Sequence, residues 1–390
     1  MHTGTTMLTL QTLHRFAAPF LFVLLLPAAL SQEADSTVLI GFAGPLSGSS
    51  AKMGQSQLHA AELALRETNA HPPRIAGKRT VFKLMPVDDR GDARTARLMA
   101  EYLVRSGVAA VIGHWNTAAS LAAAPVYAEA TIPQVAPGST GHQYTANGLP
   151  TSFRIVGHDD DGGAMAGDYA LRVLEARRIA VVDDDTLFGR NLAATFVRSL
   201  REHGVGPVAQ ESVNAKTSDF NQPLGRIRTL QPDLVFFGGL GAQAAALARS
   251  LRRMHIAAPL MAADGTVGPL FIELAGPDGE GTLGLAPGLA QEKMAGWKAF
   301  EKKYKALAEE EIEYFAPFAY DAAQVLIAAM RESNSTDGAK IAAALHAIRY
   351  NGLTGPIAFD RQGNLVNAGY SMYRLTQGKW TLVRTFGGGR

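Results

Sequence analysis

The feature that most constrains the fold of this chain is a regular alternation of short β-rich runs with helical runs. The β-rich runs lie at 38–43, 81–86, 108–112, 134–135, 178–182, 208–213, 234–237 and 259–262. The helical runs lie at 55–69, 93–106, 117–130, 189–203, 220–230 and 242–254. Strands and helices that alternate at this spacing are typical of βαβ units, in which helices cover both faces of a parallel sheet. We therefore predict an α/β fold.

The alternation falls into two series, separated near residues 151–163. Helical runs follow at 291–308, 315–331 and 337–346, and the end of the chain, 357–386, reads as strands joined by turns. The chain has 390 residues, and at about 150 residues per domain this length predicts two to three domains. The two series predict two parallel-rich sheets.

Composition removes several classes of function. Apolar residues make up 47% of the chain and charged residues 18%, which is enough apolar material for real cores and is unlike a disordered chain. Lys+Arg total 37 against 35 for Asp+Glu, so no large positive field is available and we expect no nucleic-acid partner. The absence of cysteine excludes disulfide frameworks, Cys-ligated zinc and thiol catalysis.

The first 31 residues have the features of a secretory signal peptide. An apolar run covers 16–30, and Ala29 and Ser31 offer small residues at positions −3 and −1 of a cleavage site before Gln32. The run is interrupted by two prolines and is shorter than the span of about 20 residues that a transmembrane helix needs. We expect cleavage after residue 31 and a free periplasmic protein, because no cysteine is present to carry a lipid anchor.

Polar residues at the ends of predicted strands indicate a ligand site, because ligands of parallel sheets bind at strand carboxyl ends and helix N-termini. Asn116 and Thr117 begin a predicted helix, and Ser139 and Thr140 follow the next strand. Free backbone amides, the helix dipole and these hydroxyls suit a small carboxylate. The alternative is that the first two residues only cap a helix and the other two only form a turn.

A second group of strand-end residues suits the rest of a small ligand. Asp264 follows a strand of the second series and could pair with an ammonium group, or it could be an ordinary turn aspartate. Trp115, Met53, Phe188 and Leu240 lie in similar loops and could line an apolar pocket, although each alone could equally be a core residue.

Taken in order, the strand-end motifs resemble those of type I periplasmic binding proteins, in particular the leucine/isoleucine/valine-binding proteins of branched-chain amino-acid ABC transporters. The motifs are Gly41-Phe-Ala-Gly-Pro-Leu-Ser-Gly48, Asp88-Asp89, Val111-Ile-Gly-His114, Ile132-Pro133 with Ala136-Pro137, and Phe237-Gly-Gly239. The resemblance implies two doubly wound, Rossmann-like lobes joined by three crossover segments. It places 33–156 and 287–364 in the first lobe, and 157–286 and 365–390 in the second.

The resemblance also implies roles for individual residues. Thr117 matches the hydroxyl that binds an α-carboxylate, and Ser139 and Thr140 match its second contact. Gly138 matches a backbone carbonyl that accepts from the ammonium group, and Asp264 matches the acid that pairs with it. The implied protein is a monomer, is not an enzyme, needs no cofactor or metal, and delivers an apolar amino acid to a membrane permease.

The sequence departs from this pattern in the pocket wall. Met53, Phe188 and Leu240 stand where family members often carry tyrosines, and Asp264 is one methylene shorter than the usual glutamate. An amide, a short-chain acid or an aromatic acid therefore remains an alternative ligand, and sensing remains an alternative to transport, since one fold accepts many ligands.

An exported NAD-dependent oxidoreductase is a further alternative. Gly239-Leu-Gly241-Ala-Gln-Ala244 has the G-x-G-x-x-A form of a dinucleotide fingerprint, with Asp264 about twenty residues beyond it. The motif lies deep inside the chain, however, and no catalytic partner accompanies it. A hydrolase is less consistent still, because the sequence has no G-x-S-x-G or H-E-x-x-H motif.

Overall fold

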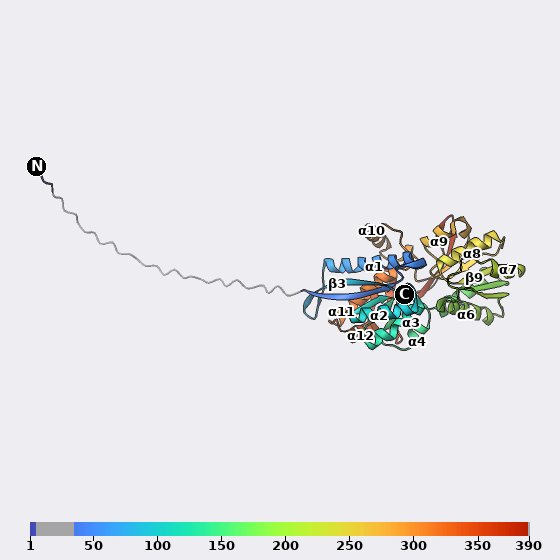
Figure 1. Ribbon diagram of the computed structural model, residues 1–390, viewed down its shortest axis with the longest axis horizontal. Coiled ribbons are helices and arrows are strands. Elements are labelled where there is room, and N and C mark those ends of the chain that lie inside the picture. Colours follow the sequence, from blue (N-terminus) through green and yellow to red (C-terminus); the bar gives the residue numbers. More distant parts are fainter. Residues whose placement is uncertain (5–34, 389–390) are drawn as a thin grey trace. The chain divides into compact units, whose positions relative to one another are not determined.

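Two mainly parallel β-sheets carry the fold, as seen in the computed structural model, which describes residues 1–4 and 35–388. Residues 35–388 belong to one compact unit. Each sheet is covered by its own helices, and we call each sheet with its helices a lobe (Figure 1). The predicted fold class, two parallel-rich α/β lobes, is confirmed.

The first sheet has strand order β2-β3-β1-β4-β5-β6, and only the β2–β3 pair is antiparallel. Its strands are β1 (Ser36–Gly44), β2 (Arg74–Ile75), β3 (Lys78–Asp88), β4 (Ala110–Gly113), β5 (Gln134–Ala136) and β6 (Ser152–Arg154). The first lobe also contains α1 (Ala51–Ala70), α2 (Ala93–Arg105), α3 (Thr117–Glu129), α4 (Gln143–Ala146), α10 (Trp297–Leu307), α11 (Ala316–Glu332), α12 (Gly338–Ala347) and the hairpin β12 (Tyr350–Gly352) with β13 (Gly355–Ile357).

The second sheet has strand order β15-β14-β11-β10-β9-β7-β8, in which the last two strands of the chain are antiparallel to their neighbours. Its strands are β7 (Ile179–Asp183), β8 (Ala209–Ser212), β9 (Leu234–Gly238), β10 (Leu260–Ala262), β11 (Leu283–Pro287), β14 (Gly369–Thr376) and β15 (Lys379–Gly387). Its helices are α5 (Asp159–Arg172), α6 (Leu187–Glu202), α7 (Asn221–Thr229), α8 (Gly241–Arg253) and α9 (Pro269–Ala275).

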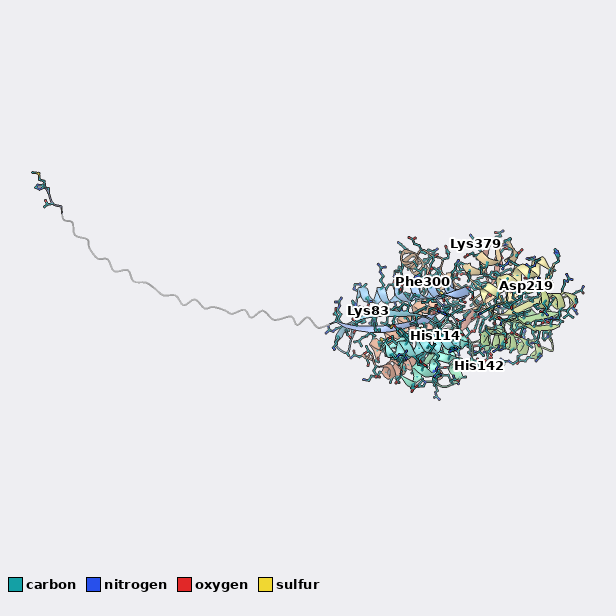
Figure 2. The ribbon with its side chains drawn as sticks, viewed as in Figure 1. Lys83, His114, His142, Asp219, Phe300 and Lys379 are labelled. Atoms are coloured by element: carbon teal, nitrogen blue, oxygen red, sulfur yellow. The ribbon has the colours of Figure 1, made fainter. Side chains whose placement is uncertain are left out.

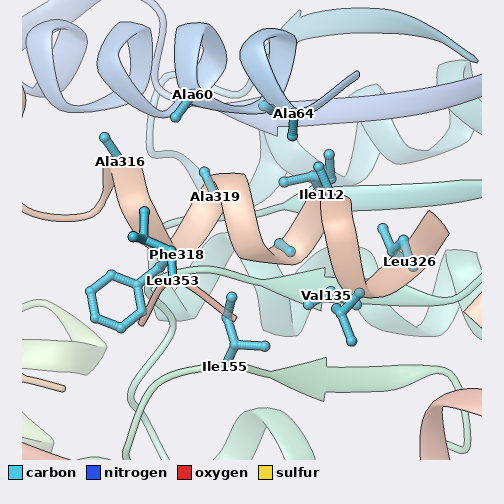
Figure 3. Close-up of a cluster of buried hydrophobic side chains, with 14 of the residues drawn as sticks. Ala60, Ala64, Ile112, Val135, Ile155, Ala316, Phe318, Ala319, Leu326 and Leu353 are labelled. Atoms are coloured by element: carbon cyan, nitrogen blue, oxygen red, sulfur yellow. The ribbon is translucent and has the colours of Figure 1, made fainter. Parts of the chain in front are cut away.

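The central strands of both sheets, such as β4, β9 and β11, are buried on both faces because helices cover each face. In β4, Ile112 packs with α1 and α11, whereas the neighbouring Val111 points to the opposite face and packs with α2 and α3. In Figure 3, Ala60 and Ala64 of α1 point toward α11, whose own apolar residues extend toward the sheet. These small side chains let the two helices approach closely over the core of the first lobe.

The chain passes between the two lobes three times. It leaves the first lobe after β6, returns after β11 to form α10 to α12, and enters the second sheet again at β14. Lys52 of α1 forms an ion pair of 2.5 Å with Glu273 of α9, and the amides of Gln143 and Asn191 exchange hydrogen bonds of 2.7 and 3.1 Å. Both contacts join one lobe to the other.

The structure contains elements that we did not predict from the sequence, among them β6, β11, α4 and α9. Two further differences concern helices. The predicted helix 291–308 is a 3₁₀ turn at Gln291–Lys293 followed by α10, because Gly296 adopts a left-handed conformation with φ of 90° just before Trp297. Helix α5 begins within 151–163, which we predicted only as a boundary, and continues to Arg172 through residues for which we predicted no element.

The predicted signal peptide, 1–31, lies almost wholly in residues 5–34, outside the described residues. Within 1–4 and 35–388, no helix has both the length and the apolar character needed to cross a bilayer.

Candidate functional site

A pocket lies between the lobes, where strands of both sheets end. It encloses about 520 Å³ of space, a volume that includes open solvent at its mouth. The first lobe contributes Gly91, Trp115, Asn116, Thr117, Ala118, Gly138 and Phe315, and the second contributes Thr186, Leu187, Phe188, Leu240, Asp264 and Gly265.

The first turn of α3 forms one end of this pocket. Thr117 is the first residue of the helix, and its neighbours Asn116 and Ala118 also line the pocket. The Asn116 side chain makes no capping hydrogen bond, so the first amides of α3 are left for another acceptor. The helix dipole adds about half a positive charge at this end. This end of the pocket therefore suits an anion without using an arginine.

Gly138 allows the loop after β5 to lie against the Trp115 indole. A Cβ atom at this position would lie 2.1 Å from Trp115 Cδ1, a distance at which the ring would have to move. Trp115 in turn meets Phe315 edge-to-face, with ring centroids 5.8 Å apart. The glycine is therefore required to set the aromatic wall of the pocket.

Ser139 and Thr140 follow Gly138 but are not among the residues that line the pocket. The Ser139 hydroxyl lies 2.6 Å from Ser120 Oγ and 3.1 Å from the carbonyl oxygens of His114 and Trp115. The Thr140 hydroxyl is buried and has no hydrogen-bond partner among the described residues. The Ser139 hydroxyl thus holds the strand-end loops together.

Asp264 lies at the second-lobe side of the pocket, directly after β10, and is only 8% exposed. Burial raises the pKa of Asp264 well above its usual value, and the charge of Asp159 raises this pKa further. No nearby cation among the described residues contributes to the pKa of this carboxyl group. A buried carboxylate of this kind is stabilised when a ligand supplies the positive charge.

The remaining wall of the pocket is apolar. Phe188 and Leu240 lie at the N-termini of α6 and α8, and Phe315 is the residue directly before α11. Trp115 and Leu240 both approach Gly265, where a Cβ would lie 3.4 Å from Leu240 Cδ2 and 3.6 Å from Trp115 Cζ2. The wall therefore suits an apolar side chain of a ligand whose polar groups lie at the two ends.

The structure brings together six of the residues that sequence reasoning proposed for the site, and these six are Trp115, Thr117, Gly138, Phe188, Leu240 and Asp264. Met53 is different, because the first turn of α1 turns its side chain into the core of the first lobe, where it is 3% exposed. Sequence reasoning missed Phe315, which lies outside the β/α alternation and carries no strand-end signal.

A buried polar chain supports the loop that carries Trp115 and Thr117. His114 (labelled in Figure 2) places Nδ1 2.6 Å from Asp89 Oδ2 and Nε2 3.2 Å from Tyr127 OH, and both His114 and Asp89 are fully buried. Arg154 is also buried and donates to the carbonyl oxygens of Ser139 and Gly141 at 2.8 and 2.9 Å. These contacts fix the backbone that presents the anion end.

The glycines of the G-x-G-x-x-A pattern are explained by packing within the second lobe. A Cβ on Gly239 would lie 2.4 Å from the Phe237 ring, and a Cβ on Gly241 would lie 2.4 Å from the Gly265 carbonyl oxygen. The 263–265 loop therefore lies against the start of α8, where a dinucleotide site would need open space for a pyrophosphate.

Among residues 1–4 and 35–388, no cluster of three or more His, Cys, Asp or Glu side chains has an arrangement that could hold a metal ion.

Comparisons with known proteins agree with this geometry. A family model described as periplasmic binding protein matches residues 37–379. An amino acid binding protein of Pseudomonas aeruginosa is 33% identical over 346 residues, covering 88% of this chain and 91% of that protein. A Leu/Ile/Val-binding protein homolog 1 of Brucella melitensis is 30% identical, covering 90% of this chain and 93% of that protein.

Solved structures agree as well. The leucine binding protein LivK of Thermotoga maritima superimposes with a TM-score of 0.82 at 25% identity, covering 90% of this chain and 99% of that one.

Proposed function

The chain belongs to the periplasmic binding protein family, and from that premise we propose that it is the substrate-binding component of an ABC transporter for a branched-chain or other apolar amino acid. The family is a class of substrate-binding proteins, and no enzymatic activity is proposed. The ligand would lie in the interlobe pocket, with the lobes closing around it.

The observation that carries this proposal is the opposition of two unlike ends in one apolar pocket. The first turn of α3, with Thr117, offers amides and a hydroxyl to a carboxylate. Asp264, from the other lobe, offers a buried negative charge to an ammonium group. An α-amino acid carries both groups on one carbon. Its carboxylate would bind the first lobe and its ammonium group would pair with Asp264 of the second lobe, so the ligand would connect the two lobes.

The apolar wall sets the expected side chain. Phe188 and Leu240 offer no hydroxyl to a polar ligand, and Trp115 and Phe315 complete an aromatic surface. Burial of a ligand's aliphatic or aromatic side chain there would contribute roughly 25 cal/mol per Å² of apolar area. Leucine, isoleucine, valine and phenylalanine are the ligands that this surface favours.

The cellular setting extends the same proposal. We propose export through cleavage after residue 31, residence in the periplasm, a monomeric state and delivery of the ligand to a membrane permease. The lobe boundaries remain as proposed from the sequence, 33–156 with 287–364 and 157–286 with 365–390, and the assignment of strands to the two sheets supports them.

The same apolar wall gives a second candidate ligand, an aromatic acid such as benzoate. A thermal-shift panel on protein that has been unfolded, washed free of bound ligand and refolded would separate the two. We expect the apolar amino acids to raise the melting temperature and benzoate, propionamide and NAD to leave it unchanged. A rise with benzoate and none with any amino acid would overturn the amino-acid proposal.

A further inference from the structure

A second cavity lies between the lobes, apart from the interlobe pocket described above. Its first-lobe wall comes from α10 and the residues on either side of it, and its second-lobe wall comes from α9, the loop before α9, β14 and β15 (Figure 1). It encloses about 790 Å³ of space, a volume that includes open solvent. This cavity, which we call the α9–α10 cavity, shares no lining residue with the interlobe pocket, although the neighbouring residues Tyr314 and Phe315 line one each.

Four aromatic side chains line the α9–α10 cavity, two from each lobe. Trp297 and Tyr314 belong to the first lobe, and Tyr373 and Trp380 belong to the second. The rings of Tyr314 and Tyr373 meet edge-to-face across the lobes, with centroids 6.1 Å apart. The Trp380 indole N–H donates to the Gly268 carbonyl oxygen at 3.1 Å, which uses its polar end. Because the faces of aromatic rings attract cations, these walls suit a cation that carries an apolar chain.

The charged side chains of the cavity are three carboxylates and one lysine. Lys305 lies 3.2 Å from Glu301 and 3.8 Å from Glu311, so it offsets part of the charge of these two. No ion pair joins Glu292 to a basic side chain in the part of the chain that the structure describes. Burial raises the pKa of Tyr373 to about 12, and the charge of Glu292 acts in the same direction, so this carboxylate is close to the ring. The cavity therefore has an excess of negative charge, with Glu292 uncompensated.

The Tyr373 hydroxyl adds a polar group to the same cavity. Tyr373 is 5% exposed, and its hydroxyl has no hydrogen-bond partner among the described residues. The neighbouring Tyr314 hydroxyl is already used, since it donates to the Pro287 carbonyl oxygen at 2.9 Å. A buried hydroxyl that lacks a partner costs free energy. Because Tyr373 lines the cavity, a ligand there can supply the missing hydrogen bond.

We propose that the α9–α10 cavity binds an alkylammonium ion, with its charge next to Glu292 and the aromatic rings and one N–H donated to the Tyr373 hydroxyl. Its alkyl chain would be covered by Trp297 and Trp380. The uncompensated carboxylate, the aromatic walls and the unpartnered hydroxyl thus match the charge, the carbon chain and the N–H groups of one ligand. Such a ligand contacts both lobes, so it stabilises the arrangement of lobes seen here. The inference does not depend on which ligand the interlobe pocket binds.

Tryptophan fluorescence can be confined to this cavity for the test. The chain has three tryptophans: Trp115 lines the interlobe pocket, whereas Trp297 and Trp380 line the α9–α10 cavity. In a Trp115→Phe background, butylammonium should therefore change the emission in a saturable way. We expect 1-butanol, which has the same chain without the charge, to bind at least about fivefold more weakly. Equal affinities for the two compounds, or no response to butylammonium, would overturn the inference.

Two substitutions in that background test the named contacts. Tyr373→Phe removes only the hydroxyl and should weaken butylammonium binding roughly three- to tenfold. Glu292→Gln removes an exposed counter-charge and should weaken it roughly two- to fivefold. Glu309→Gln is the matched control, because Glu309 is an exposed acid outside the cavity lining, and it should leave the affinity unchanged. An affinity that is the same in all three variants as in their parent would contradict the inference.

A competition experiment separates this cavity from the interlobe pocket. If butylammonium occupied the interlobe pocket, leucine would lower its apparent affinity in proportion to the leucine concentration. We expect no such loss, and we expect Asp264→Asn to bind butylammonium as its parent does. Displacement by leucine, or loss of binding in Asp264→Asn, would overturn the inference and leave the proposed function standing. If leucine does not bind while butylammonium still changes the emission of Trp297 and Trp380, the proposed function fails and the inference stands.

Discussion

Replacement of Asp264 by asparagine gives two effects of opposite sign. The substitution keeps the size of the side chain and removes its charge. In the leucine complex it leaves the ligand ammonium buried without its main counter-charge. Breaking a buried ion pair by removing one partner costs about 3–5 kcal/mol. The dissociation constant for leucine should therefore rise by roughly two to three and a half orders of magnitude, since each 1.4 kcal/mol corresponds to a factor of ten.

The stability of the ligand-free protein should change in the other direction. Burial raises the folded-state pKa of Asp264 above its unfolded value, so the folded protein binds more protons than the unfolded chain between these two values. The free energy of unfolding therefore falls as pH rises from about 4 through the folded-state pKa. At pH 8, above the pKa of the unfolded chain, folding must either bury the charge of this carboxyl group or take up a proton, and both cost free energy. Asparagine removes that cost, so ligand-free Asp264→Asn should melt at a higher temperature than wild type.

Calorimetric titration with leucine and thermal melting without ligand, both at pH 8, measure the two effects. Asp278→Asn is the matched control, because it removes a charge from the second lobe away from the pocket lining and should change neither quantity. A lower melting temperature together with weaker binding would indicate damaged folding, and unchanged binding would refute the assignment of Asp264 to the ammonium group.

Three further predictions concern the rest of the pocket. Thr117→Ala should weaken leucine binding by on the order of 1–3 kcal/mol in calorimetric titrations, because one donor is lost while backbone donors remain. Thr117→Ser keeps the hydroxyl and should retain most of the affinity. Equal losses in both variants would contradict a role for the hydroxyl. Gly138→Ala should displace the Trp115 ring, shift its fluorescence and weaken binding, whereas Gly206→Ala, where a Cβ meets nothing within 4 Å, should do neither. Leucine affinity should rise from pH 5 to 8, by at most about tenfold per pH unit, because Asp264 has to lose its proton to pair with the ammonium group. An affinity that falls over this range would show that Asp264 does not bind the ammonium group in its ionised form.

The β/α alternation was predictable because buried parallel strands are short apolar runs and the helices between them carry clear periodicity. Helix α5 was missed because it begins Asp159-Asp-Asp-Gly-Gly, a segment that looks like a polar loop. Three acidic residues in a first turn interact favourably with the helix dipole. The apolar residues of the helix come only after them, so the start of the segment shows no helical pattern of apolar residues. The break before α10 depends on the backbone conformation of Gly296, which composition alone does not reveal.

The site was predictable where it depends on strand-end loops, since parallel topology alone brings these together. Thr117 and Asp264 could be placed at the pocket in this way. The orientation of individual side chains could not be predicted. Met53 has the right position in the chain but turns inward with α1, and Phe315 reaches the pocket from a segment far along the chain.

A crystal structure of the protein with leucine tests the central claim most directly, because it locates both charged groups of the ligand at once. The account predicts leucine in the interlobe pocket, with its carboxylate at Thr117 and the first amides of α3, its ammonium at Asp264, and its side chain against Phe188 and Leu240. Leucine bound in the reverse orientation, or bound outside this pocket, would contradict the account.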